Sequence, residues 1–284
     1  MSRLSSLPWD PRFFVGSPLF LPLAASSGHF SSAAWPTRDE LNQVVAHQAL
    51  VSGGNRPLHL VPPHQPSRSA PHPGFEAKLF DSGALQFRPN NWHDFLNTLV
   101  WLTFPKAKAA LNRRHYAAQP AQRQSRKRGA ERDALTLFDE SGIVVASSDA
   151  SLLALLREFK WKDLFWRERN KVIACMRFYL FGHGLYEQAL QPFIGMTGKA
   201  VLLTIDREFT CRPLAHQLAA LDERLADDLS ALGKLVHPRE LSPLPVLGIP
   251  GWTANNSEES YYDNVDYFRP GRQHSAHGDS TKRA

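Results

Sequence analysis

The chain has 284 residues, of which 43% are hydrophobic and 11% aromatic, so it is long and apolar enough to bury a substantial core. This composition excludes a chain that is disordered throughout. Cys175 and Cys211 each lack a second thiol or a histidine at ligand spacing, which argues against a disulfide framework or a thiolate metal site and favours a reducing cytoplasm.

The net charge of +6 is concentrated in one segment. Residues 106–132 hold nine basic side chains against one acidic side chain, Glu131, so the rest of the chain is slightly acidic. No stretch reaches the roughly 18 to 20 apolar residues of a membrane-spanning helix. The apolar residues 17–25 contain two prolines and follow no basic region, so they are expected to belong to the domain and not to a signal peptide. We therefore expect a soluble protein.

The first elements are predicted from capping and turn signals. Thr37 and Glu40 have the spacing of a capping box, which predicts a helix over about residues 38–51. Residues 58–61 predict a short strand. Residues 75–88 alternate around a central turn sequence, and this pattern predicts a hairpin.

The middle of the chain is expected to contain the most buried helix. Residues 92–104 are apolar nearly all round, and Pro105 can begin a second helix that runs to about Tyr116. Residues 119–130 have no apolar periodicity and are expected to form a mobile basic loop. A second hairpin is predicted over residues 133–147.

The C-terminal half is expected to mix helices and strands. The predicted order is helices at 152–159 and 162–169, a β-rich segment at 172–181, a helix at 185–190, a strand at 199–205 and a helix at 214–232. From Ser242 the chain is rich in proline and aromatic residues and is expected to wrap the domain. No regular βαβ rhythm is present, so we predict one α+β domain over residues 1–272, with buried helices packed on short antiparallel hairpins, and a disordered tail over residues 273–284.

Residues 91–97 are the most site-like stretch of the chain. If Asn91 caps the helix, His93 and Asp94 lie in its first turn and Asn97 follows one turn later. A helix start can accommodate a ligand, a metal ion or a phosphate. The alternative is that Asn91 and Asp94 only cap the helix while His93 hydrogen-bonds to the backbone.

A second candidate lies at Gly182-His183-Gly184. His183 and Glu187 are four residues apart, so they share one face of a helix that follows a predicted strand. The flanking glycines permit close approach of another backbone. In the alternative interpretation, Gly182 only turns the chain and Glu187 faces water.

A third candidate is a pair of carboxylates, Asp133 and Asp139, on a predicted strand over residues 132–140. Carboxylates that bracket an apolar strand can hold a metal ion or act as acid and base. The alternative is that Asp139 and Glu140 only form a turn.

The basic segment carries the hypothesis of nucleic-acid or polyanion binding. Arg113-Arg114-His115 and Arg126-Lys127-Arg128 could bind phosphates, and a solvated loop would have the same composition. The candidate contacts are Lys106, Arg113, Arg114, Arg126, Lys127 and Arg128. The chain lacks G-x-S-x-G, H-E-x-x-H, C-x-x-C and G-x-G-x-x-G motifs, and residues 195–200 do not form a phosphate loop.

Several motifs together resemble a bacterial family known only as domain of unknown function 3025. They are Asn91-Trp92-His93-Asp94-Phe95-Leu96-Asn97 with Phe104-Pro105-Lys106, residues 132–140, Phe181-Gly182-His183 and Gly248-Ile249-Pro250-Gly251-Trp252. The resemblance extends from about Pro18 to Arg272. It implies no activity, cofactor or catalytic residue.

Two main functional hypotheses follow. In the first, the protein is an enzyme for acid/base or metal-assisted hydrolysis, with cofactor and metal left open. Its catalytic residues are predicted to be His93, Asp94, Asn97, His183 and Glu187, and its ligand-binding residues Trp92, Arg114, His115, Arg132, Asp133 and Asp139. This hypothesis requires His93 and His183 to share a pocket, within about 12 Å of each other. In the second, residues 106–132 form a noncatalytic nucleic-acid or polyanion-binding surface. A third possibility is an interaction protein whose polar motifs only stabilise the fold.

Overall fold

The protein is an α+β structure built around a mixed four-stranded sheet. The computed structural model describes residues 7–63, 74–118 and 129–271. The strand order is β4 (Met176–Leu180), β3 (Gly142–Ser147), β5 (Thr197–Thr204) and β6 (Ser242–Pro245). Strand β3 runs parallel to β5 and antiparallel to β4, and β6 is antiparallel to β5. All six residues of β3 are buried, as expected for a central strand with covered faces. The predicted α+β class is confirmed.

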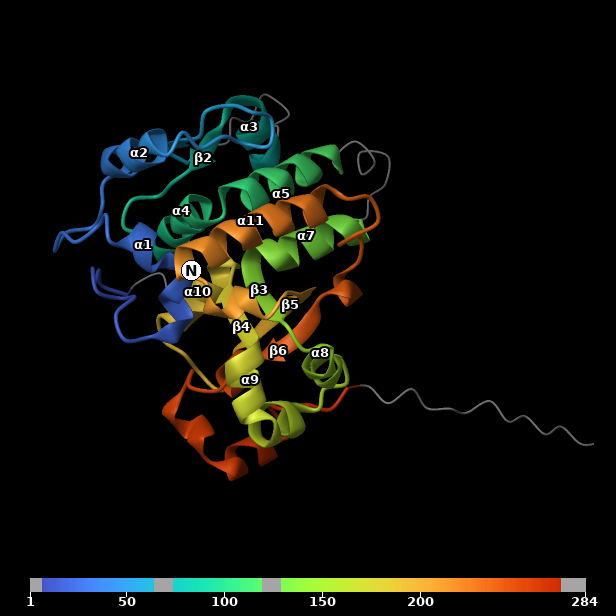
Figure 1. Ribbon diagram of the computed structural model, residues 1–284. Coiled ribbons are helices and arrows are strands. Elements are labelled where there is room, and N and C mark those ends of the chain that lie inside the picture. The colour runs from blue at the N-terminus through green and yellow to red at the C-terminus, as the bar shows by residue number, and fades with distance from the viewer. Residues whose placement is uncertain (1–6, 64–73, 119–128, 272–284) are drawn as a thin grey trace, which may run out of the picture.

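Three helices form a layer over one side of this sheet. Helices α5 (Pro105–Ala117), α11 (Leu214–Ser230) and α7 (Ala130–Ser141) lie next to one another in the upper half of Figure 1. The Asp222 carboxylate of α11 accepts hydrogen bonds from the amides of Lys106 and Ala107, at 3.1 and 2.8 Å. A carboxylate at this position satisfies amides that the first turn of α5 leaves unpaired, so it fixes α11 against α5.

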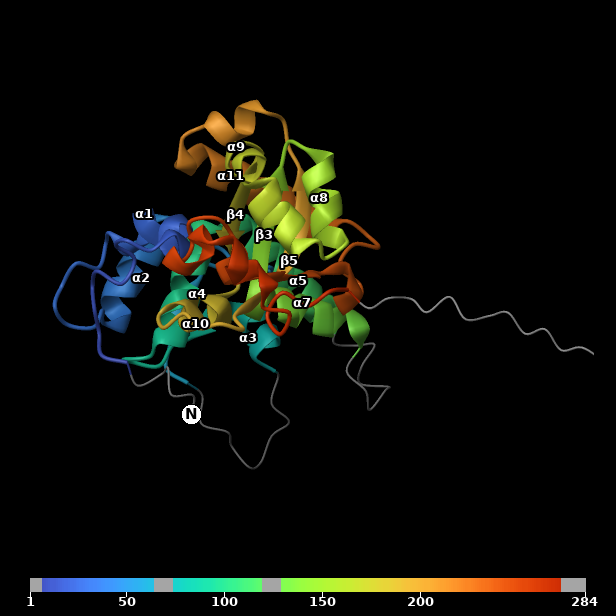
Figure 2. The same ribbon diagram turned by 90° about the horizontal axis from the view of Figure 1, so that it is seen from below.

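The other side of the sheet is covered by short helices and by the C-terminal segment. Helices α8 (Ala150–Arg157) and α9 (Arg169–Cys175) are separated by a π-helical turn at Asp163–Arg167. The C-terminal segment, red in Figure 1, lies along the lower edge of the molecule and crosses in front of the sheet in Figure 2. Its wrapping of the domain matches the sequence prediction. Residues 172–181, predicted to be β-rich, instead divide between the end of α9 and strand β4.

A smaller parallel sheet pairs β1 (His59–Val61) with β2 (Ala84–Gln86), next to α2 (Arg38–His47) and α3 (Phe75–Ser82). The predicted hairpin at 75–88 is wrong, because residues 75–82 are helical. Gly83 adopts a positive φ of 76° and ends α3, and a side chain there would collide with the carbonyl of Pro57. The turn signal was therefore a helix C-cap.

The second predicted hairpin, at 133–147, is wrong for the same reason. Residues 130–141 form α7, whose buried Ala134, Leu135 and Phe138 have helical spacing, and only β3 follows. Gly142 ends the helix. The expected strand face shared by Asp133 and Asp139 therefore does not exist, because the two residues lie on a helix.

The predictions that rested on caps are confirmed. Thr37 and Glu40 form a capping box at the start of α2, and Asn91 accepts the amide of Asp94 at the start of α4 (Trp92–Thr103). Helix α10 (His183–Ala189) begins after β4, with Phe181 and Gly182 between the two elements. The remaining helical segments are α1 (Ala24–Ser27) and 3-10 turns at Pro18–Leu23, Glu208–Cys211, Pro238–Glu240, Val246–Gly248, Ala254–Ser257 and Glu259–Asp263.

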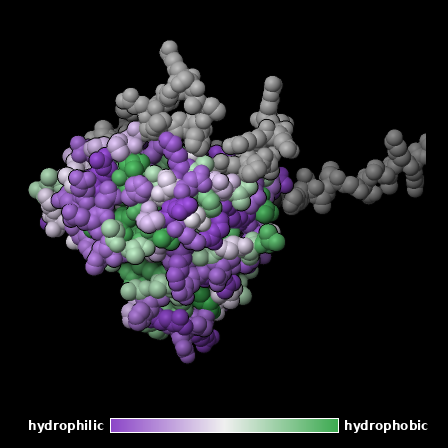
Figure 3. Space-filling model, turned by 90° about the horizontal axis from the view of Figure 1, so that it is seen from above, coloured by the Kyte–Doolittle hydropathy of each residue, from purple (hydrophilic) through white to green (hydrophobic). Residues whose placement is uncertain are grey.

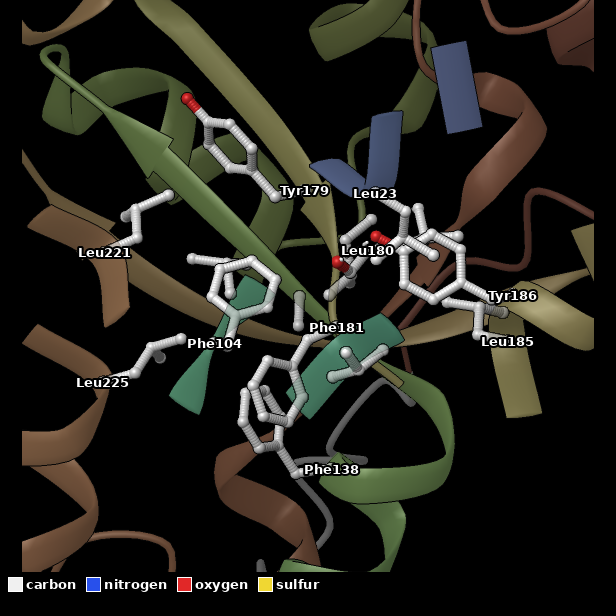
Figure 4. Close-up of a cluster of buried hydrophobic side chains, with 14 of the residues drawn as sticks. Leu23, Phe104, Phe138, Tyr179, Leu180, Phe181, Leu185, Tyr186, Leu221 and Leu225 are labelled. Atoms are coloured by element: carbon white, nitrogen blue, oxygen red, sulfur yellow. Dashed lines mark hydrogen bonds between the residues drawn. The ribbon is translucent and has the colours of Figure 1, made fainter. Parts of the chain in front are cut away.

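One part of the core packs at the end of β4 that leads to α10. Figure 4 shows Phe138 of α7 stacked on Phe181, with ring centroids 4.5 Å apart, and Phe104 next to them. Each fully buried phenylalanine contributes about 2 to 3 kcal/mol. Because Phe181 is locked in this cluster, the residues that follow it begin from a rigid position.

The face seen from above is mostly hydrophilic with small scattered hydrophobic patches (Figure 3). Among the described helices, none combines the length and the apolar character needed to cross a bilayer. Most of the predicted basic loop at 119–130 and the predicted tail at 273–284 lie outside the described residues.

Candidate functional site

The register of the sheet brings the start of α10 to the end of α7. Ile143 pairs with Leu180, and the amides of Phe181 and Gly182 both donate to the carbonyl of Gly142 at 2.9 Å. Because α7 ends at Ser141 and α10 begins at His183, these bonds hold the last turn of α7 against the start of α10. The Nε2 atom of His183 lies 3.5 Å from Oε1 of Glu140. Strand pairing therefore creates this neighbourhood from residues far apart in the chain.

The two glycines around His183 make the close approach possible. A Cβ atom on Gly182 would lie 2.5 Å from the backbone carbonyl carbon and oxygen of Glu140. A Cβ atom on Gly184 would lie 2.6 Å from Oε2 of the Glu140 side chain. Real Cβ contacts are longer, so any other residue at these positions would push α10 or the carboxylate away. The predicted role of the glycines in close backbone approach is confirmed.

His93 joins this neighbourhood from the first turn of α4. Its Nδ1 atom lies 2.9 Å from Oε2 of Glu187, and its Nε2 atom lies 3.1 Å from Nε2 of His183. The separation of the two histidines is well inside the limit set by the enzyme hypothesis. His183 and Glu187 share one face of α10, as predicted from their spacing. The two motifs singled out in the sequence therefore meet in one site.

The two imidazoles have opposite electrostatic environments. The hydrogen bond to Glu187 raises the pKa of His93 above its ordinary value, and burial opposes it. Burial lowers the pKa of His183 to about 3, although the carboxylate of Asp139 acts in the opposite direction. His183 is therefore neutral near pH 7, while His93 holds a proton more readily.

Glu140 completes a group that sequence analysis missed. The ligand atoms of His93, His183 and Glu140 all lie within 4.8 Å of one another. Burial raises the pKa of Glu140. The sequence interpretation had placed Glu140 in a hairpin turn, so its carboxylate was not considered as part of a site. The signal that would have found it is the helical spacing of the buried residues in α7.

A buried ion pair lies behind the two histidines. Lys108 of α5 is only 3% exposed, pairs with Asp139 and donates to Oδ1 of Asn97 at 3.0 Å. Burial raises the pKa of Asp139, but Lys108 and His183 outweigh that effect and leave the pKa lowered. Oδ1 of Asp139 lies 3.9 Å from Nδ1 of His183. Asp139 thus remains charged and faces the rear of the His183 ring.

Glu76 of α3 is a second carboxylate that sequence analysis missed. Its carboxylate accepts a hydrogen bond of 2.8 Å from Nδ2 of Asn112. Burial, followed by the negative charge of Asp139, raises the pKa of Glu76 to about 7. It lies in the segment predicted as a hairpin, and nothing in that pattern indicated a buried carboxylate.

His93, His183, Glu140, Asp139 and Glu76 line a pocket of about 470 Å³ between α3, α4, α5, α7 and α10. This is enough space for a small organic substrate. Glu187, which contacts His93, is not among the described residues that line the pocket. The sequence-predicted residues that line it are His93, Asp94, Asn97, His115, Arg132, Asp139 and His183. Asp94 is held by Arg88, whose Nε and an Nη atom lie 2.8 and 2.7 Å from its oxygens.

A family model matches residues 59–272, and the description of that family is "Protein of unknown function (DUF3025)". The chain belongs to the DUF3025 family. The match covers most of the chain, including all the pocket residues named above, and confirms the resemblance over that range. Neither a curated protein nor a solved structure matches the chain.

Three residues predicted to bind ligand in this DUF3025 protein are absent from the described lining of the pocket. Trp92 packs in an aromatic cluster with Trp9, and its Nε1 donates to the carbonyl of Leu7 at 3.1 Å. Arg114 pairs with Glu131, and Asp133 lies elsewhere on α7. In sequence, a tryptophan beside polar residues looks the same whether it faces a ligand or packs in the core.

The basic residues of the 106–132 segment that the structure describes have partners within the chain. Lys106 pairs with Glu223 at 2.6 Å, Lys108 is buried, and Nε of Arg113 donates to the carbonyl of Gly53 at 3.1 Å. The cluster Arg126-Lys127-Arg128 lies outside the described residues. Binding of nucleic acid or another polyanion stays a prediction.

Proposed function

We propose that the pocket containing His93 and His183 is the active site of a hydrolase. The observation that supports this most directly is that His93 and His183, from two helices, converge on one cavity, with Glu187 hydrogen-bonded to His93. Acid–base chemistry requires neighbouring groups to hold different protonation states. The pKa of His93 is raised and the pKa of His183 is lowered, which supports such a difference between the two imidazoles.

His93 is the side chain that best fits the role of proton carrier. The Glu187 carboxylate accepts a hydrogen bond from Nδ1 of His93. This bond fixes the ring and directs Nε2 toward the other polar groups of the site. In the reaction, Nε2 takes a proton from water while the water oxygen bonds to the electrophilic carbon or phosphorus of the substrate. The same proton then passes to the leaving group as its bond breaks. In a metal-assisted form, Nε2 of His93 would instead be a ligand, and the cation held there would supply the polarisation of the water in place of proton transfer by His93.

Two of the other predicted catalytic residues, Asp94 and Asn97, act as supports. Asp94 is engaged by Arg88, and Asn97 accepts a hydrogen bond from Lys108. Each holds a neighbouring charge in place at the wall of the pocket. We therefore assign the proton-transfer step to His93 with Glu187, and positioning to Asp94 and Asn97.

The test is a hydrolysis screen with chromogenic esters, anilides, phosphate monoesters and phosphate diesters, run with and without a chelator. His93→Gln is expected to lower kcat/KM by about 10² to 10⁴, the usual contribution of general acid–base catalysis. Glu187→Gln is expected to give a smaller loss, because it only orients His93. His216→Gln, an exposed histidine of α11, is the matched control. Equal turnover in wild type and His93→Gln, or no turnover in any substrate class, contradicts the proposal.

A further inference from the structure

We infer that His93, His183 and Glu140 bind one divalent transition-metal ion of the zinc, iron(II), manganese or cobalt class. The inference rests on the proposed function for the location of the site, and it names the cofactor of that site. Its test reads metal binding and not turnover, so the two proposals can fail independently.

The spacing of the two imidazoles fits a shared metal ion. Imidazole nitrogens bind zinc at about 2.0 to 2.1 Å, so two such nitrogens lie about 2.9 Å apart at a right angle and about 3.4 Å apart at a tetrahedral angle. The Nε2 atoms of His93 and His183 are 3.1 Å apart, between these two values. Oε1 of Glu140 lies 3.5 Å from Nε2 of His183, so a carboxylate is available as the third ligand.

The hydrogen bonds of His93 leave its metal-binding nitrogen available. Its Nδ1 donates to the Glu187 carboxylate, so Nε2 carries the lone pair in the neutral ring. The His183 ring turns its own Nε2 toward that lone pair, while its Nδ1 faces Asp139. Two nitrogens that face each other at this distance require a proton or a cation between them. A divalent cation can replace that proton and interact with both.

The groups around the three ligands resemble those of a metal site in which carboxylates lie beside the histidine ligands. A histidine ligand commonly gives its second ring nitrogen to a carboxylate, which orients the ring and increases its basicity. Glu187 does this for His93, and Asp139 lies behind His183. Two imidazoles with one carboxylate suit zinc and the other transition ions, whereas magnesium and calcium prefer oxygen ligands. Three protein ligands leave a coordination position for water or substrate, as in catalytic sites.

Gly184 offers a way to disturb the site without removing a ligand. Its missing side chain leaves room for the Glu140 carboxylate, because a Cβ atom there would lie 2.6 Å from Oε2. Gly184→Ala is therefore expected to displace the carboxylate from the two histidines while the end of this flexible side chain absorbs the change.

The experiment uses the full-length protein without a histidine tag, stripped of metal with a chelator. Titration calorimetry with Zn²⁺ and visible absorption with Co²⁺ are expected to show one ion per chain. Glu187→Gln, which keeps all three ligands, is expected to weaken affinity 10- to 100-fold, and Gly184→Ala by a similar factor. His93→Gln and His183→Gln are expected to weaken it more, and His216→Gln to leave it unchanged. Circular dichroism of each metal-free variant confirms that it is folded.

A second readout protects the test against variants that fold poorly. Zn²⁺ is expected to raise the unfolding midpoint of the wild type and of His216→Gln, because an ion that binds only the folded state stabilises it. Wild-type protein that binds neither Zn²⁺ nor Co²⁺ overturns the inference, as does a one-to-one site that survives in the His93→Gln, His183→Gln double variant. Hydrolysis by a protein that binds no metal overturns the inference while supporting the proposed function. Metal binding without hydrolysis supports the inference and contradicts the hydrolase.

Discussion

Replacing Glu76 by glutamine tests the electrostatics of the pocket through protein stability alone. The pKa of Glu76 rises from an ordinary 4.5 to about 7, mainly through burial. The folded state therefore holds a proton that the unfolded chain releases more easily. The resulting stability is complete below pH 4.5 and is lost as the pH rises through about 7. Above that range, the folded protein carries a buried charge that glutamine does not have.

The magnitude follows from the size of the shift. One pKa unit corresponds to about 1.4 kcal/mol, so the full shift corresponds to about 3 kcal/mol. Glu76 as a whole is only partly buried, and water screens part of this, so we expect about 2 kcal/mol. Glu76→Gln should match the wild type near pH 4.5 and exceed its unfolding free energy by that amount at pH 8. Glutamine keeps an oxygen that can accept from Asn112, so this hydrogen bond is preserved.

The assay is urea unfolding at pH 4.5, 6, 7 and 8 in the presence of a chelator. Glu258→Gln, which removes an exposed carboxylate, is the matched control and should show no pH-dependent difference from the wild type. The reasoning is refuted if the unfolding free energies of Glu76→Gln and wild type differ by the same amount at every pH, because a constant difference reports packing and not titration.

Three further variants test how the site and the fold are built, each by urea unfolding at pH 7 and the lysine variant also at pH 4. Gly182→Ala should destabilise the fold by about 3 kcal/mol, because the new methyl group meets the backbone of Glu140. In the control Gly74→Ala, the methyl group would meet none of the described atoms, so no such loss is expected. Equal effects of the two variants would disprove the close approach at Gly182. Lys108→Met should lower the free energy of unfolding by about 3 to 5 kcal/mol, because it leaves Asp139 buried without its partner, and by less at pH 4. A loss that is the same at both pH values would show that lost packing dominates. Asn256→Ala should cost about 3 kcal/mol, because its side chain bonds the carbonyls of Leu247 and Ile249; a change below about 0.5 kcal/mol would mean that water replaces these bonds.

Helix starts were predictable because their signals are local. The capping box of Thr37 with Glu40, the Asn91 cap and the proline that begins α5 each act within one turn of helix. Two helices were mistaken for hairpins, because a glycine after polar residues marks either a turn or a helix C-cap. At Gly83 the choice depends on the approach of Pro57, which the local sequence does not contain.

The sequence by itself determined the short-range parts of the site. A capped helix places His93 in the first turn of α4, and a four-residue spacing puts His183 and Glu187 on one face of α10. Only the tertiary structure decided that these parts meet and that Glu140 joins them. The physical reason is that the pairing of β3 with β4 brings the start of α10 back to the end of α7, where His183 lies beside Glu140. Strand register depends on pairing between distant segments and on the side chains buried over the whole sheet, so no local pattern specifies it.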